Sequence, residues 1–119
     1  MFNFEKPETW QKAIDFADLV YSPTRSFPSD ERFGLTNQMR RAVVSTSSNI
    51  AEGTARNSRP DDARVLEIAT GSLFEVVSQS FVSHRQGFLS LPDFERLYAA
   101  AQEQGKMLSG LRRSVLETA

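Results

Sequence analysis

Residues 58–86 read SRPDDARVLEIATGSLFEVVSQSFVSHRQ, and the architecture follows most directly from this stretch. Ser58 with Pro60 and Asp61 is typical of a helix start, because the hydroxyl can accept from a free amide and the carboxylate faces the positive helix end. Further along, the apolar side chains cover about half of the helix circumference, wider than the ~100° stripe that one packing contact needs. They are Val65, Leu66, Ala69, Leu73, Phe74, Val76, Val77 and Phe81. We therefore expect one long helix, to about Gln86, with two packing partners.

On the N-terminal side, two more segments carry apolar residues at helical spacing. The first helix is expected at about residues 9–21, because Pro23 and Pro28 each disfavour helical geometry in the residue before them. The second helix lies within residues 29–52. Gly53 follows it and is well placed as a left-handed terminating residue.

On the C-terminal side, the cap pattern recurs as Ser90-Leu91-Pro92-Asp93 and a seam at alternating steps of three and four residues follows. The seam consists of Phe94, Leu97, Ala101, Gln104, Leu108, Leu111 and Val115. Four amphipathic helices with short connections are typical of an all-α, antiparallel, up-down-up-down four-helix bundle. We expect residues 1–119 to form one such domain without strands.

Composition excludes several kinds of site. The 119 residues include 14 basic and 15 acidic side chains, one His and no Cys. Disulfides and Cys-ligated zinc are therefore excluded. With His84 as the only imidazole, the sequence lacks the parts for a His-paired nucleophile or a two-His metal site, so we expect no enzyme, metal or cofactor. The short apolar runs and the acidic start favour a cytoplasmic protein without a membrane span or signal peptide.

The basic residues favour a polyanion contact in the middle of the chain. Residues 32–64 hold six arginines and three acids, whereas residues 1–31 hold six acids and three bases. Five arginines bracket the loop at residues 54–60, namely Arg40, Arg41, Arg56, Arg59 and Arg64. Without neighbouring surface aromatics that would stack bases, they favour a sequence-tolerant contact with RNA or DNA phosphates. The alternative is that these are ordinary solvated arginines.

A polar stripe follows the second helix at steps of three and four residues. It consists of Gln38, Arg41, Ser45, Ser48 and Glu52, with Asn49 on its margin. The stripe could bind a polar partner, or Asn49 and Glu52 could tie the helix end to neighbouring helices or to another subunit. Glu52 as a general acid would need a second catalytic group, which the sequence does not supply.

Two apolar patterns lie away from the expected core centre. Phe74, Phe81 and Phe88 recur every seven residues at one edge of the third helix, and Val44 with Ala51 forms a pair of the same spacing on the second. Such stripes usually belong to a core. Otherwise they form a subunit interface, because exposed apolar patches mark interaction sites.

Two motifs resemble those of a known bacterial family. They are Gln38-Met39-Arg40-Arg41-Ala42 and Ser48-Asn49-Ile50-Ala51-Glu52-Gly53, with further matches at Trp10-Gln11-Lys12-Ala13 and Gly71-Ser72-Leu73. Over nearly its whole length the chain is similar to the four-helix-bundle proteins encoded by intervening sequences of 23S ribosomal RNA genes and to their stand-alone relatives. Thr46 and Thr70 depart from the family pattern, which usually has an apolar and a basic residue there.

The resemblance implies a left-handed bundle that assembles as a ring-like homopentamer in the cytoplasm, with no established catalytic activity. A related branch serves as accessory protein of diversity-generating retroelements, which implies nucleic acid and a reverse transcriptase as partners. The motif residues Ser48, Asn49, Glu52 and Gly53 form a polar cluster of structural or functional importance. We therefore expect a homo-oligomeric binding scaffold, or alternatively a purely structural or protein-interaction bundle.

Overall fold

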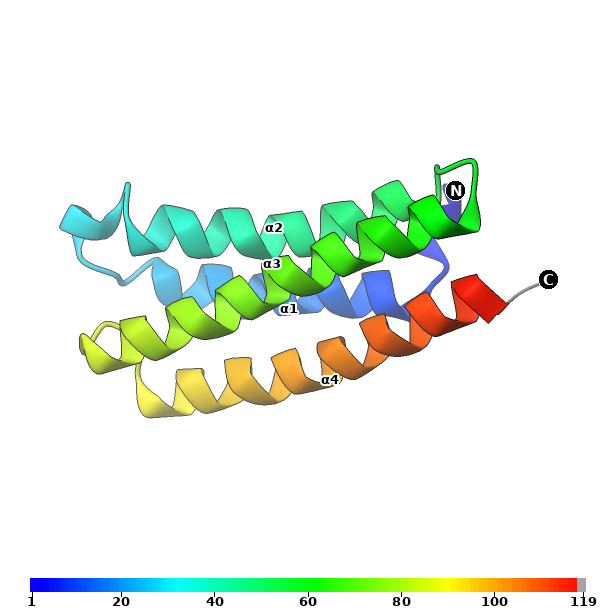
Figure 1. Cartoon of the computed structure of the whole chain (residues 1–119). Helices are drawn as coiled ribbons and strands as arrows, with labels where there is room; N and C mark the ends of the chain where they lie inside the picture. Colours follow the sequence, from blue (N-terminus) through cyan, green and yellow to red (C-terminus); the bar gives the residue numbers. More distant parts are fainter. Residues whose placement is uncertain (118–119) are drawn as a thin grey trace.

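The computed structural model describes residues 1–117, which form four α-helices and two short 3-10 helices and contain no strand. The elements are η1 (Asn3–Glu5), α1 (Glu8–Thr24), η2 (Ser29–Glu31), α2 (Leu35–Gly53), α3 (Arg59–Arg85) and α4 (Leu91–Glu117). Successive helices run in opposite directions (Figure 1). The expected up-down-up-down four-helix bundle is confirmed.

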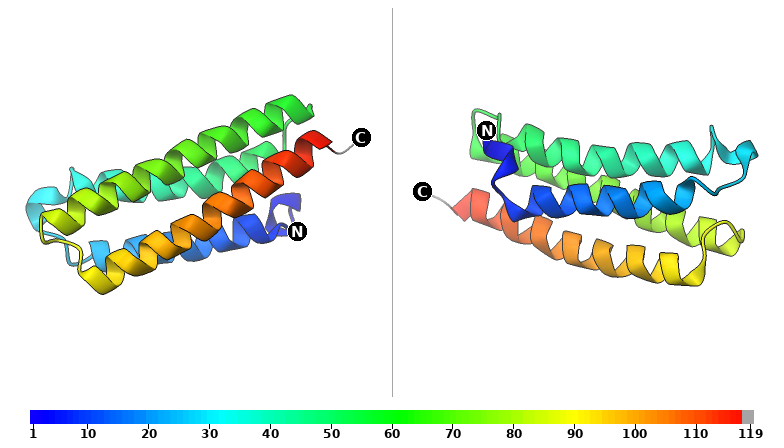
Figure 2. Two further views of the ribbon diagram at one scale, coloured as in Figure 1. Left: turned by 60° about the horizontal axis from the view of Figure 1, so that its bottom comes forward. Right: turned by 180° about the vertical axis from the view of Figure 1, so that it is seen from behind.

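The four helices form an elongated bundle of 49 × 23 × 23 Å. Both α1 and α3 pack against α2 and α4, so α1 and α3 lie diagonally across the bundle from one another (Figure 2). The expectation that the third helix has two packing partners is therefore confirmed, and both partners belong to the same chain. The α2–α3 loop and the N-terminus lie at the same end (Figure 1).

Helix α4 contributes its predicted seam to the core. Leu97, Ala101, Gln104 and Leu108 are all buried. Gln104 is the polar member, and its Nε2 donates to the Thr9 carbonyl of α1 at 3.1 Å. A buried amide needs such a partner, so this bond also fixes how α4 sits against α1.

Helix α1 ends one turn later than predicted, at Thr24, and includes Pro23. The Thr24 hydroxyl donates to the Val20 carbonyl at 2.8 Å and lies 3.1 Å from that of Tyr21. Carbonyls of a last helical turn have no partner of their own, so a side-chain hydroxyl can satisfy them. The prediction that the prolines end this helix at Tyr21 is wrong, because Pro23 falls in the final turn.

Gly53 does not terminate α2 in a left-handed conformation, and that prediction is also wrong. Within residues 1–117 only Gly87 has a positive φ, at 82°. Gly53 is instead the buried last residue of α2, where an added Cβ atom would collide with Oδ1 of Asp62. The missing side chain therefore leaves room for the carboxyl of Asp62, in the first turn of α3, beside the end of α2.

Helix α3 is the one helix in the described part of the chain that is long and apolar enough to cross a membrane, judged by length and composition alone. Nine of its residues are buried in the bundle. A helix in contact with two others uses its apolar residues for packing, so the same composition is expected of a bundle's core helix.

Candidate basic loop, polar cluster and apolar face

The structure separates the five predicted arginines into two groups. Arg56, Arg59 and Arg64 lie at the α2–α3 end of the bundle. Arg41 precedes the end of α2 by 12 residues, which is about 18 Å along the helix axis. The expectation that all five bracket one loop is wrong for Arg40 and Arg41, because α2 is straight and runs away from that loop.

Arg40 connects α2 to the C-terminal end of α1. Its Nε donates to the Thr24 hydroxyl at 3.0 Å, and its guanidinium lies 4.7 Å from the centre of the Tyr21 ring. A guanidinium that is hydrogen-bonded and stacked on an aromatic face contributes to packing as well as to charge. This geometry gives Arg40 a role within the fold.

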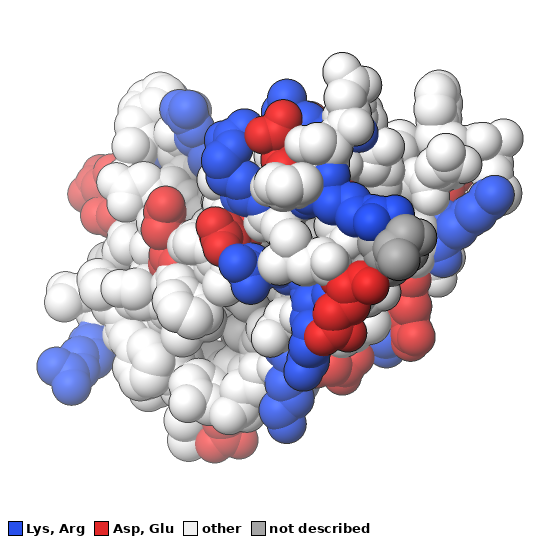
Figure 3. All heavy atoms as spheres, turned by 45° about the vertical axis from the view of Figure 1, so that its right-hand side comes forward, with Lys and Arg blue, Asp and Glu red and all other residues white. Residues whose placement is uncertain are grey.

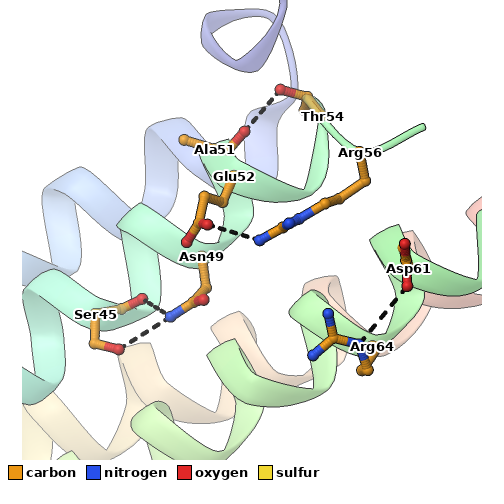
Figure 4. Close-up of polar contacts among 8 residues, drawn as sticks. All are labelled: Ser45, Asn49, Ala51, Glu52, Thr54, Arg56, Asp61 and Arg64. Carbon is orange, nitrogen blue, oxygen red and sulfur yellow. Dashed lines mark hydrogen bonds and ion pairs between the residues drawn. The ribbon is translucent and has the colours of Figure 1, made fainter. Parts of the chain in front are cut away.

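At the loop end, two of the three arginines form ion pairs with acids three or four residues earlier in the sequence. Arg56 reaches Glu52 at 2.7 Å, and Arg64 lies 3.8 Å from Asp61 (Figure 4). Arg59 is exposed and forms no ion pair with residues 1–117. Basic and acidic side chains accordingly alternate over this end of the molecule (Figure 3).

The predicted polar cluster divides into inward and outward residues. Asn49 donates from Nδ2 to the Ser45 carbonyl at 2.8 Å and to its hydroxyl at 3.0 Å (Figure 4). The same hydroxyl shares a hydrogen bond of 2.8 Å with Ser72 of α3. Asn49 therefore supports a polar contact between two helices, whereas Ser48 and Glu52 face solvent.

A polar groove of about 520 Å³ lies between α2 and α3, in front of this contact. It is lined by Phe33, Asn37, Gln38, Arg41, Ala42, Ser45, Ser72, Glu75 and Gln79. Oε1 of Gln79 is buried there without a partner among the described residues. Neither Glu75 nor Gln79 was predicted from the sequence as a site residue. Their spacing from Ser72, at three and seven residues, was the signal that could have identified them.

Helix α3 exposes bulky apolar side chains outside the core. Phe74 is 67% exposed, and Ile68, Phe81 and Val82 are close to half exposed. Phe81 is partly covered within the chain by Phe94, with ring centres 4.9 Å apart. The two packing partners of α3 therefore leave part of each of these four side chains exposed to solvent.

One of the predicted apolar interface residues lies elsewhere than expected. Phe88 follows the end of α3 and packs against Phe27 at 5.9 Å, so it does not extend the stripe of Phe74 and Phe81. On α2, Val44 is exposed and Ala51 is half-buried. The seven-residue spacing misplaced Phe88 because the helix ends at Arg85.

The single imidazole is used in packing at the far end of α3. His84 donates from Nδ1 to the Leu89 carbonyl at 2.9 Å and stacks on Phe94, with ring centres 5.2 Å apart. Within residues 1–117, no group of three or more His, Asp or Glu side chains is arranged to hold a metal ion.

Comparison with known proteins identifies a family and a fold. Residues 5–110 match the model of the 23S rRNA-intervening sequence protein family. No curated protein matches. A crystal structure of a protein of unknown function from the S23 ribosomal protein family of Bacteroides thetaiotaomicron is 21% identical, has a TM-score of 0.81, and is matched over 88% of this chain and 95% of that one. This likeness shows the shared four-helix fold. The match of the family model over most of the sequence shows that the chain belongs to the 23S rRNA-intervening sequence protein family.

Proposed function

We propose that this chain is a non-enzymatic, homo-oligomeric scaffold in the cytoplasm that holds nucleic acid, or an enzyme acting on it, at its α2–α3 loop. The apolar surface that α3 leaves uncovered carries the first part of the proposal. A ring of five copies and a reverse transcriptase as partner are what the family resemblance suggests for this assembly.

Self-association follows from the energetics of the exposed side chains. Full burial of a Val, Ile or Phe side chain stabilises by about 1.5–3 kcal/mol, so covering a half-exposed one contributes about 1 kcal/mol. The free energy of burying the four exposed side chains on α3 offsets part of the entropy lost on association. They are Ile68, Phe74, Phe81 and Val82. An isolated copy would leave this surface in water.

The experiment that tests self-association places a charge on the most exposed of these side chains. Phe74→Glu should reduce the mass measured by light scattering at micromolar concentration, with the helical circular dichroism unchanged. Leu91→Glu is the matched control, since Leu91 is also about half exposed but lies at the start of α4. An unchanged mass for Phe74→Glu would show that this face is not used in assembly.

The contact with nucleic acid rests on Arg59 and its neighbours. Arg59 is free within residues 1–117, and the pairs Arg56–Glu52 and Arg64–Asp61 are exposed. Exposed ion pairs contribute less than about 1 kcal/mol each, so a phosphate can replace the acid. Several copies in one assembly would then multiply a weak attraction.

The purely structural scaffold is the second candidate, and the same ion pairs favour it. Glu52, Asp61 and Glu67 each neutralise an arginine at this end of the bundle. A surface with alternating charge attracts a polyanion less than an uninterrupted basic patch does.

Salt-dependent binding to single-stranded RNA and double-stranded DNA distinguishes the two candidates. If the loop contacts phosphates, replacing Arg56, Arg59 and Arg64 with Gln should weaken binding and lower the log–log salt slope by about one for each phosphate that is no longer neutralised. The same replacement of Arg25, Arg32 and Arg85, which are exposed at the opposite end, is the matched control. Equal effects of both triple variants, or no binding by the unmodified protein, would favour the purely structural scaffold over nucleic-acid binding at the loop.

A further inference from the structure

An open groove of about 770 Å³ lies between α3 and α4 on the face that carries Phe74. Its floor is apolar, formed mainly by Leu73, Phe74, Val77, Tyr98 and Ala101. Gln102, Gly105 and Ser109 continue it along α4, and no acidic residue lines the groove. Its shape and composition suit an amphipathic helix of another chain.

The rim of the groove carries two cations. Lys106 and Arg113 stand on α4, seven residues apart, and neither forms an ion pair with residues 1–117. Seven residues are two helical turns, so both lie on one side of α4 at a separation of about 10 Å along its axis. An occupant of this groove therefore needs acidic groups at a matching distance.

The outer face of α1 has the complementary pattern. Glu8, Asp15 and Asp18 are exposed on it and form no ion pair with residues 1–117. Glu8 and Asp15 are also seven residues apart, which repeats the separation of the two cations. Ile14, at 39% exposure, directly precedes Asp15 and supplies an apolar side chain to one side of the two acids. The only base of α1, Lys12, is turned toward α4, where it pairs with Glu103 at 3.5 Å.

These two surfaces cannot meet within one molecule. Helix α1 lies diagonally opposite α3 (Figure 2), so its outer face points away from the bundle. The groove opens between α3 and α4. Charge complementarity with matched spacing therefore points to a second copy of this chain as the occupant. One copy can offer its α1 face and its groove at the same time.

We infer that the α3–α4 groove receives the outer face of α1 from a second copy, with Glu8 and Asp15 facing Lys106 and Arg113 and Ile14 lying on the aromatic floor. This inference rests on the proposed self-association and names the surfaces that carry it. Because two different surfaces meet, the contact is head-to-tail and produces a ring when the rotation closes.

A reciprocal charge reversal tests the inference. One variant carries Glu8→Lys with Asp15→Lys, and the other carries Lys106→Glu with Arg113→Glu. Each variant alone places like charges on both surfaces and should sediment as single copies at micromolar concentration. A chain that carries all four changes restores opposite charges at every contact, so its sedimentation coefficient should return to that of the unmodified assembly. Two control variants, Asp30→Lys with Glu95→Lys and Arg25→Glu with Arg85→Glu, change the charge equally at other exposed sites.

Each remaining outcome overturns the inference in a way that can be told apart from failure of the proposed function. If the unmodified protein assembles and both reversed variants do so equally well, the groove does not bind the α1 face of a second copy. The proposed homo-oligomeric scaffold is then unaffected. If the variants dissociate but the chain with all four changes does not assemble, the two surfaces do not face one another. Single copies of the unmodified protein would end both proposals.

Discussion

At the scale of single residues, the family motif contributes first to helix packing. Asn49 is placed by two hydrogen bonds to Ser45, which in turn bonds Ser72 of α3. Gly53 leaves room for Asp62. The sequence suggested these positions as a polar cluster, but the division between inward Asn49 and outward Ser48 depends on the rotation of α2, which periodicity alone fixes only approximately.

Asn49→Ala should lower the free energy of unfolding by about 1 kcal/mol, because it removes a partly buried donor from the contact between α2 and α3. Ser48→Ala is the control on the solvent side of the same helix and should change stability by less than about 0.5 kcal/mol. Urea unfolding followed by circular dichroism measures both. Equal losses would mean that the hydrogen bonds of Asn49 do not support the helix contact.

Asp62 should make stability depend on pH. Burial beneath Gly53 raises the pKa of this carboxyl above its ordinary value of 3.8, so the folded protein favours the protonated form. The stabilisation from protonation is complete below the ordinary pKa and is lost as pH rises through the raised value. Asp62→Asn should therefore be more stable than the unmodified protein at pH 7, and the difference should shrink as the pH falls toward 3.8. A difference that grows on acidification would contradict this assignment.

At the scale of secondary-structure elements, the two helix starts with a Ser cap were predicted closely, whereas the end of α1 was not. The caps at Ser58 and Ser90 hold, with each hydroxyl accepting from the amide three residues later at 3.3 Å. Both caps depend only on residues that are neighbours in the sequence, so the sequence pattern is sufficient to predict them. The end of α1 depends on the hydrogen bonds of Thr24, and the contact between Gly53 and Asp62 joins residues on different helices, so neither is stated by a local pattern.

Ser58→Ala should destabilise the protein by about 1 kcal/mol, because the first turn of α3 then keeps an unsatisfied amide. Ser58→Asp should retain most of the stability, since a carboxylate accepts the same bond and favours the positive helix end. Thermal unfolding of the two variants makes the comparison. Equal stability of the Ala and Asp variants would show that the cap contributes nothing at this helix.

At the scale of the whole molecule, the bundle could be predicted and its surfaces could not. Helical spacing identified four helices, and the wide apolar arc of α3 indicated two partners. The groove with Lys106 and Arg113 became visible only once α3 and α4 were placed side by side. For the same reason, the sequence alone did not show that the length of α2 separates Arg41 from the loop arginines in space.

The mass of the unmodified protein in solution tests the central claim most directly. Sedimentation velocity at micromolar protein should show a discrete assembly of several 13.4 kDa chains, because the exposed side chains of α3 and the charged faces of α1 and α4 need partners. Well-behaved single copies across the micromolar range would contradict it.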